Sequence, residues 1–248
     1  MHLTDFFKQH QKIALAFSGG VDSAYLLYAA IHTGCDVHAY YVKSAFQPQF
    51  ELEDAKKLAD LLNASMTILE LNVLEDPVIM ENPSNRCYYC KKKIFTAIKE
   101  AAAKDGYEVL IDGSNASDDA KDRPGMKAVA ELQVFSPLRM CGITKSEVRK
   151  LSKEAGLFTW DKPAYACLAT RIPSGTPITS EKLIATETSE AILSSLGFTD
   201  FRIRLSGNDA KIQVKEEQLE KLLLYRKEIL EKLKPHYSAV TVDLEVRS

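Results

Sequence analysis

The chain has 248 residues, of which 46% are apolar and 27% are charged, and its formal net charge is −2. These proportions are ordinary for a globular protein with a sizeable core, and the length predicts one large or two modest domains. They give no reason to expect a nucleic-acid partner, a membrane span of roughly 20 apolar residues, or a signal peptide, so we expect a cytoplasmic protein.

The first 160 residues alternate short apolar runs with helical patterns. A capping box at Thr144-Lys-Ser-Glu147 marks the start of the last helix. Such alternation predicts an α/β fold, with a parallel sheet that carries helices on both faces. The expected strands are 13–17, 37–42, 66–71 and 108–112, and the expected helices are 22–33, 51–62, 90–104 and 144–155.

The pattern changes after residue 160. Residues 161–179 hold three prolines and one glycine, and they are expected to form a functional loop or linker. Residues 180–248 then predict a small α+β domain, and residues 1–160 form the larger one. In the small domain the expected helices are 181–196 and 216–233, and the expected strands are 201–205, 211–214 and 239–246.

A polar loop, Ser18-Gly-Gly-Val-Asp-Ser23, joins the first strand to the first long helix. Two glycines let the backbone turn tightly, and consecutive N–H groups at a helix start form an anion site. Ser18 and Ser23 add hydroxyls, and Asp22 can cap the helix or bind magnesium. The loop is neither a Walker A nor a dinucleotide-binding motif. It resembles the pyrophosphate loop of PP-loop ATP pyrophosphatases, with Ser18, Gly19, Gly20, Asp22 and Ser23 as pyrophosphate-binding residues.

The five cysteines suit reduced thiols or metal ligands better than a disulfide framework. Cys87 and Cys90 form a CxxC motif just before a lysine-rich helix, which leaves zinc, iron–sulfur and redox interpretations. A structural zinc site needs four ligands, and no second CxxC or His pair follows in the sequence. We therefore favour a cluster whose third ligand is Cys167, while Cys35 and Cys141 are expected to be small core residues.

Four motifs follow one another along the chain: the glycine loop, "NPSNRCYYCKKKIF", "DGSNASDDAKDRPGMKA" and "KPAYACLATRIPSG". Together they are similar to the motifs of the LarE family of ATP-dependent sulfur transferases, which make the nickel-pincer cofactor of lactate racemase. The resemblance covers nearly the whole chain, and the Arg-Ile-Pro-x-Gly and Asp-Arg-Pro-Gly stretches are its most specific parts.

The resemblance implies that ATP, with Mg²⁺, adenylates each carboxylate of pyridinium-3,5-biscarboxylic acid mononucleotide. Pyrophosphate is released, and a sulfur nucleophile then displaces AMP to give a thiocarboxylate. One form of the family sacrifices the cysteine matched by Cys167, which becomes dehydroalanine. Another form carries a [4Fe-4S] cluster on three cysteines. Because Cys87 and Cys90 accompany Cys167 here, the resemblance favours the cluster form.

The resemblance also assigns residues beyond the cysteines. Arg202 and Arg204 match arginines that bind the substrate phosphate, and their spacing on a strand puts both on one face. Solvated arginines at a sheet edge are the alternative. Glu190 matches an acidic position near the substrate, or else lies on a solvated helix face. Asp122 and Arg123 contact ATP or the adenylate, unless they only form a turn.

Two other interpretations of the chain's function remain open. A tRNA-thiolating PP-loop enzyme would share ATP, cluster and sulfur, although the −2 charge and the lack of an RNA-binding domain speak against it. A metal-binding interaction protein with an inactive loop is the non-enzymatic alternative. The resemblance further implies a homo-oligomer, while the sulfide donor is not identified.

Overall fold

The computed structural model describes residues 2–118 and 124–247. The chain divides into two compact units, which we describe separately. Unit 1 comprises Met1–Val73 and Asn85–Lys162, and unit 2 comprises Leu74–Ser84 and Pro163–Ser248. Within the described ranges, no helix combines the length and the apolar character that a membrane crossing needs.

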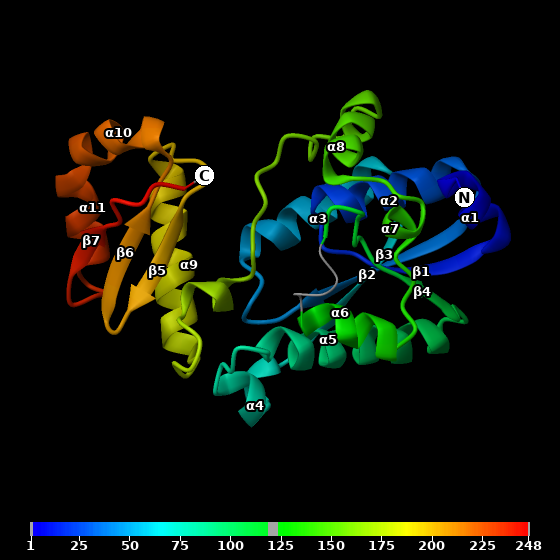
Figure 1. Ribbon diagram of the computed structural model, residues 1–248, viewed down its shortest axis with the longest axis horizontal. Coiled ribbons are helices and arrows are strands. Elements are labelled where there is room, and N and C mark those ends of the chain that lie inside the picture. The colour runs from blue at the N-terminus through cyan, green and yellow to red at the C-terminus, as the bar shows by residue number, and fades with distance from the viewer. Residues whose placement is uncertain (1, 119–123, 248) are drawn as a thin grey trace. The chain divides into compact units, whose positions relative to one another are not determined.

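Unit 1 is built on a four-stranded sheet in the order β3-β2-β1-β4, and every pair in it is parallel (Figure 1). This confirms the predicted parallel α/β fold. From β1 the chain adds β2 and β3 on one side of the sheet, and it then adds β4 on the other side of β1. The strand order therefore reverses between β1 and β4. Ligands of open α/β sheets bind at the carboxyl ends of strands at such a point. The strands are β1 (Lys12–Ala16), β2 (Asp36–Lys43), β3 (Ser65–Glu70) and β4 (Val109–Ile111).

Helices cover both faces of this sheet because its central strands are apolar on both sides. Ile13 and Leu15 of β1 pack into one core cluster, and Ala14 between them packs into another. The first cluster lies under α2 and α3, and the second lies under α5 and α6, on the opposite side of the sheet (Figure 1). The helices of unit 1 are α1 (Leu3–Gln9), α2 (Val21–His32), α3 (Gln49–Leu61), α5 (Arg86–Lys104), α6 (Pro124–Glu131), α7 (Pro137–Met140) and α8 (Lys145–Glu154).

The capping box of α8 forms as predicted, since Thr144 Oγ1 accepts from the backbone N–H of Glu147, and Glu147 accepts from that of Thr144. The expectation for α5 was wrong at its start. The helix begins at Arg86, so the CxxC motif lies inside its first turn rather than before it. Asparagine precedes it at the N-cap position, where this residue type is favoured.

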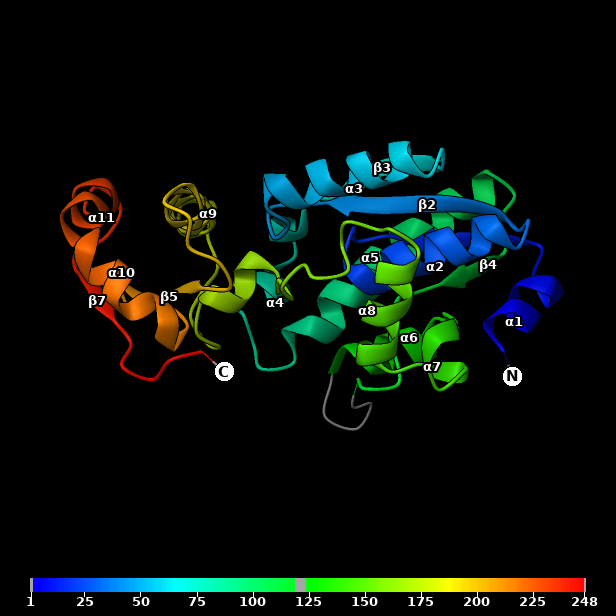
Figure 2. The same ribbon diagram turned by 90° about the horizontal axis from the view of Figure 1, so that it is seen from above.

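Unit 2 contains a three-stranded sheet in the order β5-β6-β7, with α9 against it and α11 beside α9 (Figure 2). The predicted long helix 216–233 is broken, because α10 ends before Tyr225 and α11 starts after it. The last predicted strand is shorter than expected. The elements are α4 (Pro77–Met80), α9 (Ser180–Ser195), β5 (Arg202–Ser206), β6 (Asp209–Gln213), α10 (Leu219–Leu224), α11 (Arg226–Leu233) and β7 (Val240–Val242).

Candidate functional site

The polar loop follows β1 and ends in the first turn of α2. Its two serines are bonded to each other and to the turn: Ser18 Oγ lies 3.1 Å from Ser23 Oγ and accepts from the backbone N–H of Gly20 at 3.3 Å. Ser23 Oγ donates to the carbonyl of Gly20 at 3.1 Å. The first N–H groups of an α-helix have no partner within the helix. The loop is therefore a preformed turn whose amides can bind an anion.

Gly19 and Gly113 are both needed for close approach of backbone segments. Gly19 has φ +70°, and a Cβ there would stand 3.1 Å from the Cβ of Ala55 in α3. A Cβ on Gly113 would stand 3.1 Å from the backbone nitrogen of Ser23. The turn after β4 is therefore packed directly against the polar loop after β1, as expected where neighbouring parallel strands end.

Asp22 does not cap its own helix. Its carboxylate instead accepts a hydrogen bond from Asn115 Nδ2 at 3.2 Å and forms a short ion pair with the ammonium of Lys145. Sequence reasoning missed both partners. Lys145 is the first residue of the capping-box helix α8, and Asn115 lies in a motif quoted only as a whole. Together these side chains place an anion and a cation next to the loop.

Asp112 organises the turn after β4. Its buried carboxylate accepts from Ser114 Oγ at 2.7 Å, Ser136 Oγ at 2.6 Å and the backbone N–H of Ser114. Because its carboxylate accepts these hydrogen bonds within the turn, Asp112 stabilises the turn and is not directed toward a ligand. The predicted nucleotide-contacting residues Asp122 and Arg123 lie outside the described residues.

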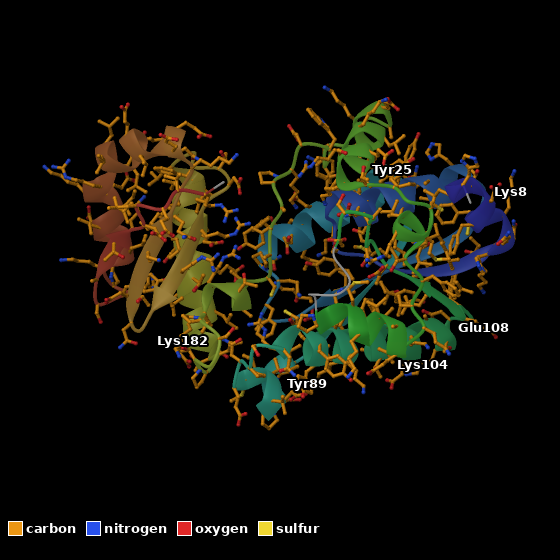
Figure 3. All side chains as sticks on the ribbon, in the orientation of Figure 1. Lys8, Tyr25, Tyr89, Lys104, Glu108 and Lys182 are labelled. Carbon is orange, nitrogen blue, oxygen red and sulfur yellow. The ribbon has the colours of Figure 1, made fainter. Side chains whose placement is uncertain are left out.

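The thiols of Cys87 and Cys90 lie three residues apart on the first turn of α5, so they neighbour each other on one face of the helix. Tyr89, which lies between them in the sequence, is labelled in Figure 3 and marks this part of α5. Cys87 is exposed and Cys90 is half-buried, and neither is in a disulfide. The two thiols thus have the spacing of a pair of ligands on one helix.

Cys35 behaves as the sequence predicted. It is buried in the core and donates its S–H to the carbonyl of His10 at 3.1 Å. Burial, with the neighbouring charge of Asp36, raises the pKa of Cys35 to about 11. Cys141 is half-buried against the same cluster, and burial raises its pKa as well. Neither has the accessible thiolate that sulfur chemistry needs.

Cys167 belongs to unit 2, where it precedes a short 3₁₀ helix, Leu168–Arg171. Its carbonyl accepts from both the backbone N–H and the hydroxyl of Thr170. The Arg-Ile-Pro-Ser-Gly stretch that follows is held by Asn82, whose amide donates to the carbonyls of Ile172 and Pro173. Asn82, the first residue of one motif, thus binds the segment that follows Cys167 within unit 2.

Arg202 and Arg204 alternate on β5 as predicted but have different surroundings. Arg202 is buried and donates to the carbonyls of Phe201 and Ala164, and burial together with repulsion from Arg171 lowers its pKa to about 10. Arg204 is exposed and donates to the side chain of Gln213. Glu190 is also buried, so a solvated helix face is wrong for it.

The described residues contain no group of three or more His, Cys, Asp or Glu side chains that could hold a metal ion. The glycine loop, Lys145 and the CxxC pair belong to unit 1, and Cys167 with the two predicted phosphate-binding arginines belongs to unit 2. Each unit therefore carries part of the predicted chemistry.

A family model described as "Thiamine biosynthesis protein (ThiI)" matches residues 7–192. The curated relatives include a protein of Lactiplantibacillus plantarum named pyridinium-3,5-bisthiocarboxylic acid mononucleotide synthase, which is 32% identical over 96% of this chain and 87% of its own length. An uncharacterized Synechocystis protein, slr1717, is 36% identical over 90% of this chain and 83% of its own length.

A tRNA-specific 2-thiouridylase of Clostridium botulinum, MnmA 2, is more distant. It is 26% identical over 60% of this chain and 52% of its own length. The likeness to sulfur-transferring enzymes thus extends over nearly the whole chain for the L. plantarum relative, and over little more than half of it for the tRNA-modifying one.

Proposed function

Because the chain belongs to the LarE family of PP-loop sulfur transferases, we propose that it converts the carboxylates of pyridinium-3,5-biscarboxylic acid mononucleotide to thiocarboxylates at the expense of ATP. The observation that carries this proposal is the alignment with the L. plantarum synthase along 96% of the chain. The preformed loop at Ser18–Ser23 supports it, since that turn suits a polyphosphate.

In the first step, a carboxylate oxygen of the substrate attacks the α-phosphorus of ATP, and the bond to the bridging oxygen of the β-phosphate breaks. The amides of the loop and the hydroxyls of Ser18 and Ser23 bind the departing pyrophosphate. Asp22 would hold Mg²⁺, which when bound neutralises charge on the phosphates. An inert carboxylate oxygen thereby becomes part of a good leaving group, AMP.

In the second step, a sulfur nucleophile attacks the carbonyl carbon of the adenylate, and AMP departs with the electron pair of the C–O bond. The cycle then repeats on the second carboxylate. Arg204, which is exposed on β5, is suited to bind the substrate phosphate directly. Arg202 serves the same phosphate from a buried position.

We propose that Cys87, Cys90 and Cys167 hold a [4Fe-4S] cluster. The CxxC pair fits this role because its cysteines lie three residues apart on one helix, so their thiols are on the same face, and neither is in a disulfide. When bound, the cluster supplies sulfur carried on the iron that no protein thiol ligates. The alternative is that the Cys167 sulfur itself is transferred. In that case its thiolate displaces AMP from the adenylate and forms a thioester. A base then removes the Cα proton of Cys167 while the Cβ–S bond breaks, so the thiocarboxylate leaves with the sulfur and dehydroalanine remains.

The two-part organisation supports a division of labour. We propose that residues 1–160 bind ATP, that 161–179 form the functional loop, and that 180–248 bind the substrate or another copy of the chain in a homo-oligomer. We also propose that the protein acts in the cytoplasm, on a small molecule rather than on a nucleic acid, and that its product serves lactate racemase maturation.

The test is anaerobic incubation of the iron- and sulfide-reconstituted protein with ATP, Mg²⁺, the pyridinium substrate and added sulfide as the sulfur source, followed by mass spectrometry of product and protein. We expect the bisthiocarboxylate in excess over protein, with the protein mass unchanged. Loss of one H₂S at Cys167, with one sulfur transferred per chain, would establish the sacrificial alternative. Absence of any thiocarboxylate would refute the proposed function.

A further inference from the structure

Three buried charged side chains and one tyrosine surround the segment that carries Cys167. Burying charge in a protein is costly, and apolar residues of equal volume often stabilise a fold at least as well. Stability alone therefore does not explain why this charged network is buried. We refer to these four residues, all in unit 2, as the Tyr165 clamp: Tyr165, Arg171, Glu190 and Arg202.

Glu190 is the centre of the clamp. Both of its carboxylate oxygens accept from Arg171, at 2.8 Å from Nε and 3.2 Å from Nη2. The hydroxyl of Tyr165 donates to the same carboxylate at 2.6 Å, and the backbone N–H of Ile203 in β5 donates at 3.0 Å. The carboxylate of α9 is thus bonded to both the Cys167 segment and the small sheet.

The arginines of the clamp hold the backbone on the N-terminal side of Cys167. Arg171 donates to the carbonyl of Ala166, and Arg202 donates to the carbonyl of Ala164. The residue that lies between these two carbonyls is Tyr165, and the residue that follows them is Cys167. The clamp therefore fixes the chain immediately before the reactive cysteine.

Tyr165 joins the parts of the clamp. Its ring faces the guanidinium carbon of Arg171 at 4.6 Å and that of Arg202 at 5.2 Å from its centroid, which is cation–π distance, while its hydroxyl binds Glu190. Burial disfavours the cation of Arg171, but its bonds to Glu190 outweigh this and raise its pKa. Arg171 is therefore held as a cation within the network.

We propose that Tyr165 is a positioning residue for sulfur transfer, which locks the backbone beside Cys167 so that the Cys167 sulfur occupies one place. This inference rests on the proposed function for its catalytic consequence but not for its structural one. It applies whether Cys167 is a cluster ligand or a nucleophile, because both roles need a fixed sulfur.

The structural part is tested by amide hydrogen exchange of the apoprotein, without cluster or substrate. Tyr165→Phe keeps the ring and removes only the hydroxyl, so the fold is preserved. We expect exchange in the peptide spanning residues 164–172 to accelerate by about tenfold, since local opening becomes easier. The matched control is Tyr237→Phe, which removes another buried hydroxyl in unit 2, next to Ser189 and Thr186, and should leave this peptide unchanged.

The catalytic part is tested by steady-state kinetics on the same variants. Tyr165→Phe should lower kcat for thiocarboxylate formation by about tenfold and leave the KM for ATP unchanged, because displacing a reacting group by a fraction of an ångström acts on the chemical step. Tyr165→Leu, which also removes the ring, should lower kcat further. Tyr237→Phe should retain wild-type kcat.

The outcomes separate this inference from the proposed function. Unchanged exchange in Tyr165→Phe overturns the clamp, and faster exchange with wild-type kcat overturns its positioning role. If wild-type protein makes no thiocarboxylate while Tyr165→Phe still exchanges faster, the proposed function fails, the clamp itself stands, and its role in sulfur transfer is rejected.

Discussion

Lys145 is a residue that the structure adds to the candidate site, because its ammonium pairs with Asp22 at the start of α2. If Asp22 holds Mg²⁺ as proposed, this ammonium would be released from the ion pair and could bind a phosphate oxygen of ATP. The sequence showed Lys145 only as the first residue of a capped helix. Spacing along the chain carries no information about a pair 123 positions apart.

Lys145→Ala should raise the KM for ATP about tenfold to hundredfold, as expected for the loss of one charge-assisted hydrogen bond. Initial rates of AMP formation at varied ATP concentration measure this. Lys150→Ala is the control, because Lys150 lies on the same helix with 76% of its side chain exposed. Equal KM values for the two variants would remove Lys145 from the nucleotide site.

At the scale of elements, hydrophobic periodicity predicted the four parallel strands and the long helices of unit 1, because burial on a sheet face dictates both. The short helix α6 was missed, since its Pro124-Gly125 start is typical of a turn. Proline is also favoured in the first turn of a helix, and Gly125 allows α6 to pack closely on Lys91 of α5.

The loop after β1 provides an element-scale prediction. In Gly19→Ala the new Cβ sits on a residue with positive φ and lies 3.1 Å from the Cβ of Ala55. Gly34→Ala is the matched control, because Gly34 also has a positive φ, +76°, but a Cβ there has no heavy atom within 4 Å. Both should lose about 1 kcal/mol of unfolding free energy from backbone strain. Only Gly19→Ala should also lose AMP formation, by about a hundredfold, because the anion-binding amides are displaced.

Urea unfolding and nucleotide assays on both glycine variants measure these effects. Normal AMP formation by Gly19→Ala would show that the loop does not have to keep this conformation, and the pyrophosphate assignment would then fail. Equal loss of activity in Gly34→Ala would mean that general destabilisation, and not loop geometry, lowers the rate.

At the scale of the whole molecule, the sequence predicted two domains with different sequence patterns, with the CxxC pair in the first and Cys167 in the loop 161–179 between them. Linking Cys167 to the CxxC pair depended on its place in the loop 161–179 and on family resemblance, because two cysteines within one helix turn have a fixed geometry and a third one far along the chain does not. The C-terminal helix was predicted as unbroken, since the pattern on both sides of Tyr225 is equally helical.

The cysteines make a prediction for the assembled enzyme. Cys167→Ala should abolish thiocarboxylate formation, and Cys87→Ala should abolish it only if sulfur is carried on a cluster. Iron and sulfide analysis after anaerobic reconstitution should show the cluster lost in Cys87→Ala and retained in Cys141→Ser, the half-buried control. Wild-type protein that stays iron-free under these conditions would exclude the cluster.

The central claim is that this chain activates a carboxylate by splitting ATP between the α and β phosphates. The most direct measurement is the nucleotide balance of a reaction with the pyridinium biscarboxylate, by separation of AMP, ADP, pyrophosphate and thiocarboxylate product. We expect two AMP and two pyrophosphate for each bisthiocarboxylate, and no AMP when the pyridinium substrate is left out. ADP with free phosphate as the nucleotide products, or AMP formation independent of the substrate, would contradict it.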